Sequence, residues 1–379
     1  MKILVVTNYL PPKIGGIERI SHELASALND LEDIDVSVAT AKWPSKFIEA
    51  EWEKIYYPYK VIDFPTITIF RRLPLPRVFQ RSFWAKIKDL DQGFDLVLYQ
   101  SHLFILNWII LVRLRKVRRR VWMNQGCNYV PLNSKVAGFI SFIYERLGMA
   151  IMKRFCNEFV GQSRNTADWI SSKVGISFQV LSNATNLKRI IPKSNIVVRQ
   201  IRTKVLFVGR LVEGKGLLDC VSVISKANEL LILKDDPNLF TLTIVGAGPI
   251  RDQISRQKLN VEIEFRGELS HDKVIESMYE SDILIQAYGQ PEGLTTVTLE
   301  ALATGLLIVT TPLGGGDKLD RCVNYISGNL DELPNLLLSS RALPRSRDEL
   351  LALGRGFIEA GLTWDCVAQR LINQDYSKF

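Results

Sequence analysis

Short apolar runs alternate with amphipathic stretches along most of this chain. Residues 3–7, 96–99 and 204–208 have the length and the branched apolar content of buried strands. Between such runs, apolar residues recur every three or four positions, as they do in residues 17–28, which indicates helices packed on a sheet. The other expected strands are 36–39, 121–123, 159–163, 180–183, 242–245, 263–265, 283–285 and 306–309. The pattern predicts an α/β fold with parallel sheets.

The alternation is interrupted at two places. Roughly residues 42–80 are irregular and rich in Pro and aromatic residues, so no element is assigned to them, and residues 188–202 form a basic and weakly patterned connector at which we place the domain boundary. A chain of 379 residues also exceeds the size at which single cores stop growing. We therefore expect two doubly wound, Rossmann-like domains, residues 1–190 and 200–358, that face a central cleft. A helical segment at about 360–379 is expected to pack back on the first domain.

Residues 281–311 form the most informative unit of the sequence. An apolar strand is followed by a glycine-containing loop, by a helix that Thr295 or Thr296 can cap and that Gly305 ends, and by a second buried strand. This order directs the N–H groups and the positive dipole end of the helix toward a ligand above the sheet.

Two glutamates mark this unit, Glu292 in the loop and Glu300 in the helix. One interpretation is a loop charge and a solvated helix residue, because charged residues are mostly exposed. Glu300, however, lies between Leu299 and Ala301 in an otherwise apolar helix. A nucleotide sugar suits the unit, because its diphosphate would meet the amides and its hydroxyl groups would donate to the carboxylates.

Residues 209–216 place Arg210 and Lys215 in a glycine-bearing loop directly before a helix. Two cations beside a helix N-terminus are typical of a site for a diphosphate. The alternative is a pair of surface cations near a turn.

The first domain offers weaker signals. Gly15-Gly16 follows the first strand and precedes a helix, which fits either a plain turn or a close approach to a ligand. His102 lies just past the strand at 96–99, where α/β proteins gather their chemistry, although a hydrogen-bonded structural histidine fits the same position.

Composition narrows the class of protein. Hydrophobic residues make up 47% and charged residues 23% of the chain, as in ordinary folded proteins. Five scattered cysteines without a CxxC pair argue for a reducing compartment and against a structural zinc site, and three histidines leave little material for a metal centre. No signal peptide is evident, residues 103–112 are too short to span a bilayer, and Glu145-Arg146 interrupts residues 136–152. We expect a cytoplasmic protein, soluble or peripheral on the inner face of a membrane.

Charge is unevenly distributed. Residues 1–190 contain 27 Lys and Arg against 16 Asp and Glu, whereas the remainder contains 21 against 24. The densest run is Arg113, Arg115, Lys116, Arg118, Arg119 and Arg120, which we expect to face solvent or an anionic membrane surface. The basic, aromatic residues 70–84 fit either a lipid interface or a solvated helix with a core face. Nucleic acid is not expected, because no recognition motif is present.

A dinucleotide-dependent dehydrogenase would share much of this pattern. The candidate phosphate-binding turn, residues 246–251, lacks the third glycine of the dinucleotide fingerprint. We therefore set an NAD enzyme aside.

Several motifs, taken together and in order, resemble the family 4 retaining glycosyltransferases, which have the two-domain GT-B fold. The matching segments are GGIER, FVGRLVEGKG, TIVGAGP, FRGELS and SDILIQAYGQPEGLTTVTLEALATG, and more loosely VGQS and LSNA. They cover most of the second domain and the ends of the first. The combination is specific for fold and reaction class and says little about the substrate.

The resemblance implies a role for each matched residue. Gly15 and Gly16 would offer amides to the donor phosphates, and His102 would be catalytic, near the sugar and the acceptor. Glu292 would contact the donor sugar and support positive charge at its ring. The remaining implied donor-binding residues are Arg210, Lys215, Leu269, Gly293, Leu294, Thr295 and Glu300, with Arg210 and Lys215 holding the diphosphate in place of a metal ion.

This chain departs from the family pattern at three positions. Gln125-Gly126 replaces the usual His-Gly, Ala184 replaces a glycine after Asn183, and Asp317 follows the late glycines where a glutamate is usual. Gln125 is accordingly an acceptor-side candidate.

We expect a metal-independent, retaining hexosyltransferase without a cofactor, which moves a hexose from a UDP- or GDP-sugar to a lipid-linked or surface-polysaccharide acceptor. The alternative is a catalytically weak sugar-nucleotide-binding or scaffold protein of the same fold.

Overall fold

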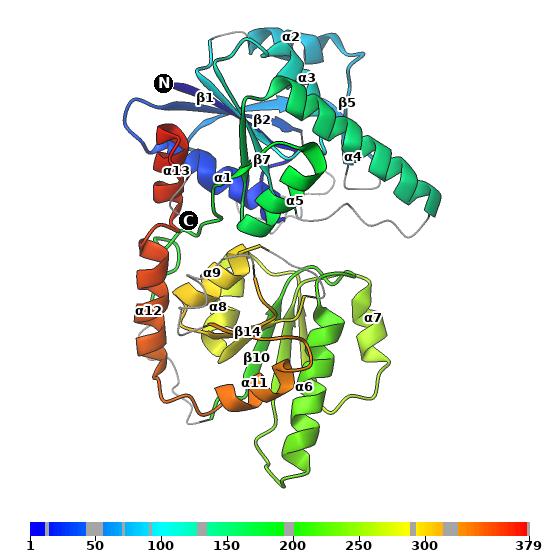
Figure 1. Cartoon of the computed structure of the whole chain (residues 1–379), viewed down its shortest axis with the longest axis vertical. Helices are drawn as coiled ribbons and strands as arrows, with labels where there is room; N and C mark the ends of the chain where they lie inside the picture. Colours follow the sequence, from blue (N-terminus) through cyan, green and yellow to red (C-terminus); the bar gives the residue numbers. More distant parts are fainter. Residues whose placement is uncertain are drawn as a thin grey trace. The chain divides into compact units, whose positions relative to one another are not determined.

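The computed structural model describes residues 1–11, 15–42, 56–69, 73–90, 93–126, 135–192, 201–288, 293–313 and 325–376. The chain divides into two compact units (Figure 1). Unit 1 comprises Met1–Asn183 together with Trp364–Phe379, and unit 2 comprises Ala184–Thr363. None of the helices in these residues is long and apolar enough to cross a bilayer.

Unit 1 contains, within the described residues, a seven-stranded sheet in the order β3-β2-β1-β6-β7-β8-β9, and all its strand pairs are parallel. The chain order reverses between β1 and β6, which makes their carboxyl ends the switch point of the sheet. The strands are β1 (Lys2–Val6), β2 (Asp35–Ala41), β3 (Lys60–Phe64), β6 (Leu96–Gln100), β7 (Arg119–Asn124), β8 (Glu158–Gly161) and β9 (Gln179–Val180), and a separate antiparallel hairpin joins β4 (Thr66–Ile69) to β5 (Leu73–Pro76). The helices are α1 (Gly16–Asn29), α2 (Arg81–Asp89), α3 (Ile105–Arg113), α4 (Lys135–Phe155), α5 (Arg164–Val174) and α13 (Trp364–Asn373).

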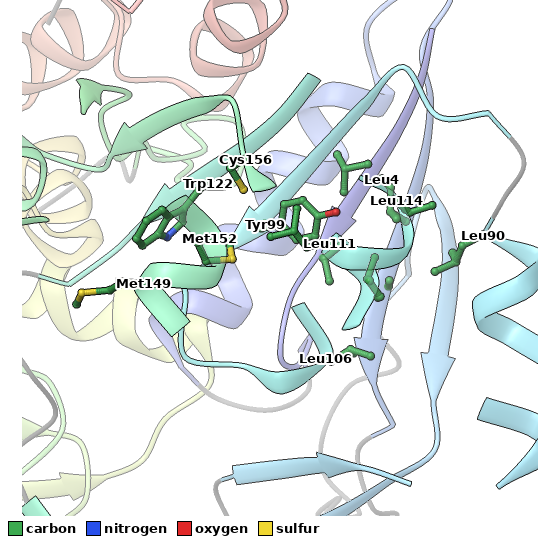
Figure 2. Close-up of a cluster of buried hydrophobic side chains, with 14 of the residues drawn as sticks. Leu4, Leu90, Tyr99, Leu106, Leu111, Leu114, Trp122, Met149, Met152 and Cys156 are labelled. Carbon is green, nitrogen blue, oxygen red and sulfur yellow. The ribbon is translucent and has the colours of Figure 1, made fainter. Parts of the chain in front are cut away.

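Strand alternation explains how unit 1 builds its core. Leu4 and Val6 of β1 lie in a cluster with residues of α3 and α4, whereas Ile3 and Val5, also fully buried, alternate to the other face. Figure 2 shows part of the first cluster, in which Leu111 of α3 and Met152 of α4 surround Tyr99. Both faces of the sheet are therefore covered, as parallel sheets require.

Unit 2 has the same architecture. Its six-stranded sheet runs β12-β11-β10-β13-β14-β15 in the described residues, again parallel throughout, with the switch point between β10 and β13. Its strands are β10 (Lys204–Val208), β11 (Thr241–Val245), β12 (Glu262–Gly267), β13 (Ile283–Gln286), β14 (Leu307–Thr310) and β15 (Tyr325–Ser327). Its helices are α6 (Leu217–Ile232), α7 (Ile250–Ser255), α8 (His271–Glu280), α9 (Thr296–Ala303), α11 (Leu333–Ser340) and α12 (Arg347–Glu359). The expected α/β class with two Rossmann-like domains is confirmed.

Two parts of the fold differ from the sequence-based expectation. The pattern assigned no element to residues 42–80, but β3 extends the first sheet there and the hairpin follows it. In unit 2, the sequence pattern predicts a helix over residues 273–279 that His271 and Asp272 cap. The helix, α8, instead begins at His271, and Ser270 is its N-cap residue.

The basic run at residues 113–120 was expected to face solvent throughout, and this is wrong for its last two members. Arg119 donates to both carboxylate oxygens of Glu158, at 2.7 and 2.8 Å, and to the carbonyls of Leu371 and Ile372 in α13. Arg120 donates to the carbonyls of Phe155 and Val117. Arg119 and Arg120 are the first two residues of β7, and their guanidinium groups bind neighbouring elements of unit 1 instead of facing solvent.

These contacts hold the C-terminal helix on unit 1. Glu158 also accepts from the Tyr376 hydroxyl at 2.9 Å and from Gln374 Nε2 at 3.0 Å. Burial by itself raises the pKa of Glu158, but the hydrogen bonds and charge of Arg119, with those from Tyr376 and Gln374, outweigh it and hold the pKa below the ordinary value. Glu158 therefore remains ionised and joins β7, β8 and the end of the chain.

We expect Glu158→Gln to loosen α13. Losing charge-assisted hydrogen bonds at a half-buried site lowers the local opening free energy by about 2 kcal/mol, so amides of α13 should exchange with deuterium roughly thirtyfold faster at neutral pH. Because the folded pKa is depressed, the stabilisation is present above the unfolded pKa of about 4.3 and is lost as the pH falls through the lower folded value. The difference between variant and wild type should therefore shrink in acid.

The matched control is Glu264→Gln, which removes a carboxylate that also pairs with an arginine, Arg266, but at an exposed site in unit 2. Exposed pairs contribute little, so exchange in α13 should not change. Equal protection of the α13 amides from exchange in wild type and Glu158→Gln would show that Glu158 does not hold this helix on unit 1.

Candidate functional site

The switch point of unit 2 brings together most of the residues that the sequence predicted for a donor site. The loop at residues 209–216 leaves β10 and leads into α6, and Arg210 in it is exposed. Lys215 is half-buried, with its ammonium 5.8 Å from the ring centroid of Tyr288, which follows β13. Two cations thus lie in the loop that joins the carboxyl end of β10 to a helix N-terminus.

This loop is fixed by backbone packing rather than by side chains. Gly216 has φ +73°, and a Cβ built there would lie 1.9 Å from the carbonyl oxygen of Ala287. Gly246, with φ +135°, approaches the carbonyl of Gly209 equally closely. The amides of Gly209 and Leu211 donate to the carbonyls of Val245 and Ala247, both at 3.0 Å. The loops after β10, β11 and β13 are therefore held against one another, and glycine is required where backbone meets backbone.

The start of α9 is anchored to the same edge. Thr295, one of the two residues that the sequence offered as a cap, is the N-cap residue, and its hydroxyl accepts from the amide of Thr298 at 3.1 Å. Thr298 donates to Gln286 Oε1 at 2.9 Å, and Gln286 Nε2 donates to the Tyr288 hydroxyl at 2.9 Å. The helix N-terminus is thereby fixed to the end of β13, next to the ring that Lys215 faces. Gly305, with φ +71°, follows the helix end, also as predicted.

Glu300 is enclosed in the structure, with 3% of its side chain exposed. Its Oε1 lies 3.3 Å from Nε2 of His271, the first residue of α8. Sequence reasoning missed His271 as part of the site, because the two residues belong to different helices. The position of Glu300 in an otherwise apolar helix did indicate that this carboxylate has a buried polar partner.

The other predicted residues of this group lie around α8 and α9. Leu269 is half-buried between β12 and α8. Gly293 is half-buried and Leu294 buried, both directly before α9. Glu292 lies outside the described residues. The described residues contain no group of three or more His, Cys, Asp or Glu side chains placed to hold a metal ion.

The switch point of unit 1 contains the first-domain candidates. Gly15 is the N-cap residue of α1, and Gly16 begins the helix directly after the loop that leaves β1. His102 follows the neighbouring strand β6. Ser101, which lies between the end of β6 and His102, has a left-handed backbone with φ +75°, which is uncommon for a residue other than glycine. Asn107 holds this strained turn by donating to the carbonyls of Gln100 and Ser101, at 3.0 and 2.8 Å.

His102 is buried, with 4% of the residue exposed, and it is held from three sides. Its Nδ1 lies 3.2 Å from Oδ1 of Asn124, its Nε2 lies 3.7 Å from a carboxylate oxygen of Glu145, and its ring meets the edge of Trp122. Glu145 is 1% exposed and comes from α4. From the sequence, Glu145 was interpreted only as an interruption of an apolar run. A carboxylate in such a run indicates a buried partner, and this holds for Glu145 as it does for Glu300.

Gln125 follows the end of β7, and β7 pairs with β6, the strand that His102 follows. Its Nε2 donates to Oε1 of Gln100, the last residue of β6. With Asn124 and His102, these amides form a polar edge above the first sheet. Side-chain amides both donate and accept, which suits recognition of hydroxyl groups.

Sequence comparison identifies the chain by two profiles. The profile described as Glycosyltransferase Family 4 matches residues 14–189, and that described as Glycosyl transferases group 1 matches residues 202–329. An uncharacterized glycosyltransferase from Methanocaldococcus jannaschii is 25% identical over 84% of this chain and 83% of its own. A GDP-mannose-dependent monoacylated alpha-(1-6)-phosphatidylinositol monomannoside mannosyltransferase from Corynebacterium glutamicum is 23% identical over 98% of this chain and 97% of its own. The GPI3 subunit of yeast phosphatidylinositol N-acetylglucosaminyltransferase is 23% identical over 83% of this chain and 68% of its own.

Solved structures agree at the level of the fold. HepE from Anabaena, in complex with UDP-glucose, superposes with a TM-score of 0.67 and 16% identity over 99% of both chains. WaaG, a glycosyltransferase involved in lipopolysaccharide biosynthesis, gives a TM-score of 0.64 and 16% identity over the whole of both chains. The fold is therefore the GT-B fold of glycosyltransferases. With both profiles matched, the chain belongs to glycosyltransferase family 4.

The close approach at Gly216 gives a direct test of the loop. We expect Gly216→Ala to lower Tm by at least about 6 °C, because an added Cβ overlaps the Ala287 carbonyl and displaces the loop. Gly214→Ala is the matched control: its φ is +82°, but no atom lies within 4 Å of the added Cβ. Only the left-handed strain of about 1 kcal/mol applies, so the shift should be about 2–4 °C. Equal shifts in calorimetry would mean that the close packing of the loop is unimportant.

Proposed function

We propose that this chain is a metal-independent, retaining hexosyltransferase that takes its sugar from a UDP- or GDP-sugar. The observation that supports this most is the switch point of unit 2, where Arg210, Lys215 and the starts of α6 and α9 gather at one edge. Cations and helix N-termini bind a diphosphate and stabilise it as a leaving group, the role that a metal ion fills elsewhere. The comparisons favour the same donors, because HepE was solved with UDP-glucose and the Corynebacterium relative is named for GDP-mannose.

Each remaining candidate has a place in this proposal. Glu300, oriented by His271, accepts hydrogen bonds from the ribose hydroxyls, and Glu292 does so from the donor sugar. Leu269 and the amides of Gly293 to Thr295 contact the nucleotide sugar, and the amides of Gly15 and Gly16 contribute to phosphate binding.

The reaction exchanges one bond at the anomeric carbon of the sugar. The bond from this carbon to the phosphate oxygen breaks, and a bond to the acceptor oxygen forms on the same face. The acceptor proton passes to an oxygen of the departing diphosphate. His102, held by Asn124 and Glu145, and Gln125 line the acceptor side.

We propose a lipid-linked or surface-glycan acceptor at the cytoplasmic face of a membrane. Two relatives are named for phosphatidylinositol-based acceptors, and WaaG for lipopolysaccharide biosynthesis. In this chain Arg113, Arg115, Lys116 and Arg118 are exposed and would attract an anionic surface.

The donor site is tested by thermal shift with UDP, GDP, ADP and NAD on wild type and on Arg210→Ala/Lys215→Ala. We expect stabilisation by UDP or GDP, equivalent to about 2.7 kcal/mol at a ligand concentration of 100 Kd, and its loss in the double variant. Arg251→Ala/Arg256→Ala removes the same charge from α7 and its end and should keep the shift. No shift with any diphosphate, or a shift with NAD alone, would refute a sugar-nucleotide site.

The role of Glu300 separates nucleoside from phosphate recognition. We expect Glu300→Gln to weaken binding of UDP or GDP by at least about tenfold, because a charged acceptor for ribose hydroxyls is lost, and to leave inorganic pyrophosphate binding unchanged. Titration calorimetry with both ligands measures this. Equal weakening of pyrophosphate would show that Glu300 supports the loop instead of contacting the ribose.

A weak catalyst or scaffold would show the nucleotide shift but no transfer. Incubation of UDP- and GDP-hexoses with lipid-linked or glycan acceptors, followed by measurement of the free nucleoside diphosphate against an acceptor-free control, distinguishes this alternative.

A further inference from the structure

Both ring nitrogens of His102 face protein groups, although the sequence predicts a catalytic role for this residue. Nδ1 lies 3.2 Å from Oδ1 of Asn124, and Nε2 lies 3.7 Å from a carboxylate oxygen of Glu145, which is too far for a hydrogen bond and within the range of an ion pair. The ring packs at 65° to that of Trp122, with the centroids 5.6 Å apart, and 4% of the residue is exposed. A substrate could reach either nitrogen only by displacing Asn124 or Glu145.

The backbone at His102 is held as firmly as the ring. Trp108 of α3 donates from Nε1 to the His102 carbonyl at 2.8 Å, and the hydroxyl of Tyr144 in α4 donates to the Leu103 carbonyl. The helix backbone at Gly148 approaches the His102 carbonyl so closely that a Cβ there would overlap it. One turn of α4 is therefore packed against the residue, and His102 cannot swing toward a substrate unless the helix moves.

Asn124 determines which nitrogen of His102 donates a hydrogen bond. Asn124 Nδ2 donates to the carbonyl of Gly126 at 2.8 Å, so the amide oxygen is the atom that faces the ring. An amide oxygen only accepts hydrogen bonds, which makes His102 Nδ1 the donor. The flipped ring would place carbon atoms against Asn124 and Glu145 and would lose both contacts. The hydrogen bonds thus assign a proton to Nδ1.

The Asn124 amide connects the His102 ring to the turn at Gln125. It is bound by the ring on one side and by the Gly126 carbonyl on the other, so the two contacts flank Gln125. Gln125 is half-buried, and its Nε2 donates to Oε1 of Gln100. Its own Oε1 is buried and has no hydrogen-bond partner among the residues that the structure describes. A buried acceptor in this state is one that a ligand donor can satisfy.

We propose that His102 is a positioning residue, held between Glu145 and Asn124, which fixes the turn from which Gln125 contacts the acceptor. Gln125, and not His102, then accepts a hydrogen bond from an acceptor hydroxyl group. The inference rests on the proposed function for the reaction that it serves. A side-chain amide binds a hydroxyl group but is no general base, so this side of the site recognises the acceptor and leaves its proton to the departing diphosphate.

Histidine NMR tests the arrangement without any substrate. The chain has only three histidines, so protein labelled with ¹⁵N at histidine gives spectra that His22→Leu and His271→Gln can assign. We expect a proton on Nδ1 of His102 at neutral pH, with or without bound UDP or GDP. An Nδ1 without a proton would overturn the proposal, because this ring would then not hold Asn124.

Two substitutions separate positioning from proton transfer. His102→Asn places an amide N–H close to the position of Nδ1–H but cannot act as an acid or base, whereas His102→Leu removes the donor. The readout is nucleoside diphosphate released from UDP-glucose or GDP-mannose, with methyl hexosides or water as acceptor. We expect kcat of His102→Asn within about threefold of wild type and that of His102→Leu at least about tenfold lower. Each substitution is also made with Glu145→Gln, so that no buried carboxylate loses its partner.

A double-mutant cycle shows whether His102 acts through Gln125. In a Gln125→Ala background, His102→Leu should lower kcat by less than about twofold, because the contact that His102 positions is already absent. A merely structural role would instead add its loss to that of Gln125→Ala. The thermal shift by UDP or GDP, measured on each variant, reports folding and the donor candidates of unit 2 separately.

His22→Leu is the matched control. It removes another buried histidine of unit 1, which is 3% exposed and lies 2.7 Å from the Tyr59 hydroxyl through Nδ1. This substitution should lower Tm, as the loss of a buried polar contact does, but should leave kcat within about twofold of wild type.

Two kinetic results would overturn the proposal. Equal losses in His102→Asn and His102→Leu would require a group that exchanges protons with substrate, and additive losses of His102→Leu and Gln125→Ala would show that His102 acts independently of Gln125. If wild type releases no diphosphate, the proposed function fails, and crystal structures of the two His102 variants then decide the positioning role. Gln125 should leave Gln100 in His102→Leu and stay in His102→Asn, and an unmoved Gln125 in both would contradict the inference.

Discussion

The direction of the strands is the constraint on which the rest of this structure depends. Every strand pair of the two main sheets is parallel in the residues that the structure describes, so each sheet gathers its carboxyl ends at one edge. At the point where strand order reverses, neighbouring loops diverge to opposite faces and leave space above the sheet. The loops at 209–216 and after β13 in unit 2, and the Gly15 loop and His102 in unit 1, all occupy such positions. The sheet topology therefore fixes the positions of these loops, whatever side chains they carry.

Within unit 2, the edge is rigid because backbone is packed on backbone. The glycines at 216 and 246 admit carbonyl groups of neighbouring loops where a side chain would overlap them, and paired amides lock the loops together. The cap at Thr295 ties the start of α9 to β13. A site built in this way is preorganised for a charged ligand, since its dipoles need not reorient when the ligand binds.

The sequence was most informative where the chemistry is local. The periodic strands, the Thr295 cap and the Gly305 helix end could all be predicted, because each depends on neighbouring residues and on backbone conformation. The strand β3 was missed because its residues adjoin a segment without clear periodicity, and only pairing with β2 defines it. Arg119 and Arg120 were misassigned to the surface because their partners, Glu158, the α13 carbonyls and Phe155, are distant in sequence. For the same reason the buried pairs of Glu145 with His102 and of Glu300 with His271 could be anticipated only as carboxylates in need of a partner. The roles of His102, Gln125, Arg210, Lys215 and Glu300 in the reaction stay predictions.

The most direct test of a sugar-nucleotide site in unit 2 is a crystal structure of the chain soaked with UDP or with GDP. We expect diphosphate oxygens within hydrogen-bond distance of Arg210 and Lys215 and of the first amides of α9, with the ribose hydroxyls on Glu300. A nucleotide bound elsewhere, or in this place but with its phosphates directed away from Arg210 and Lys215, would contradict it.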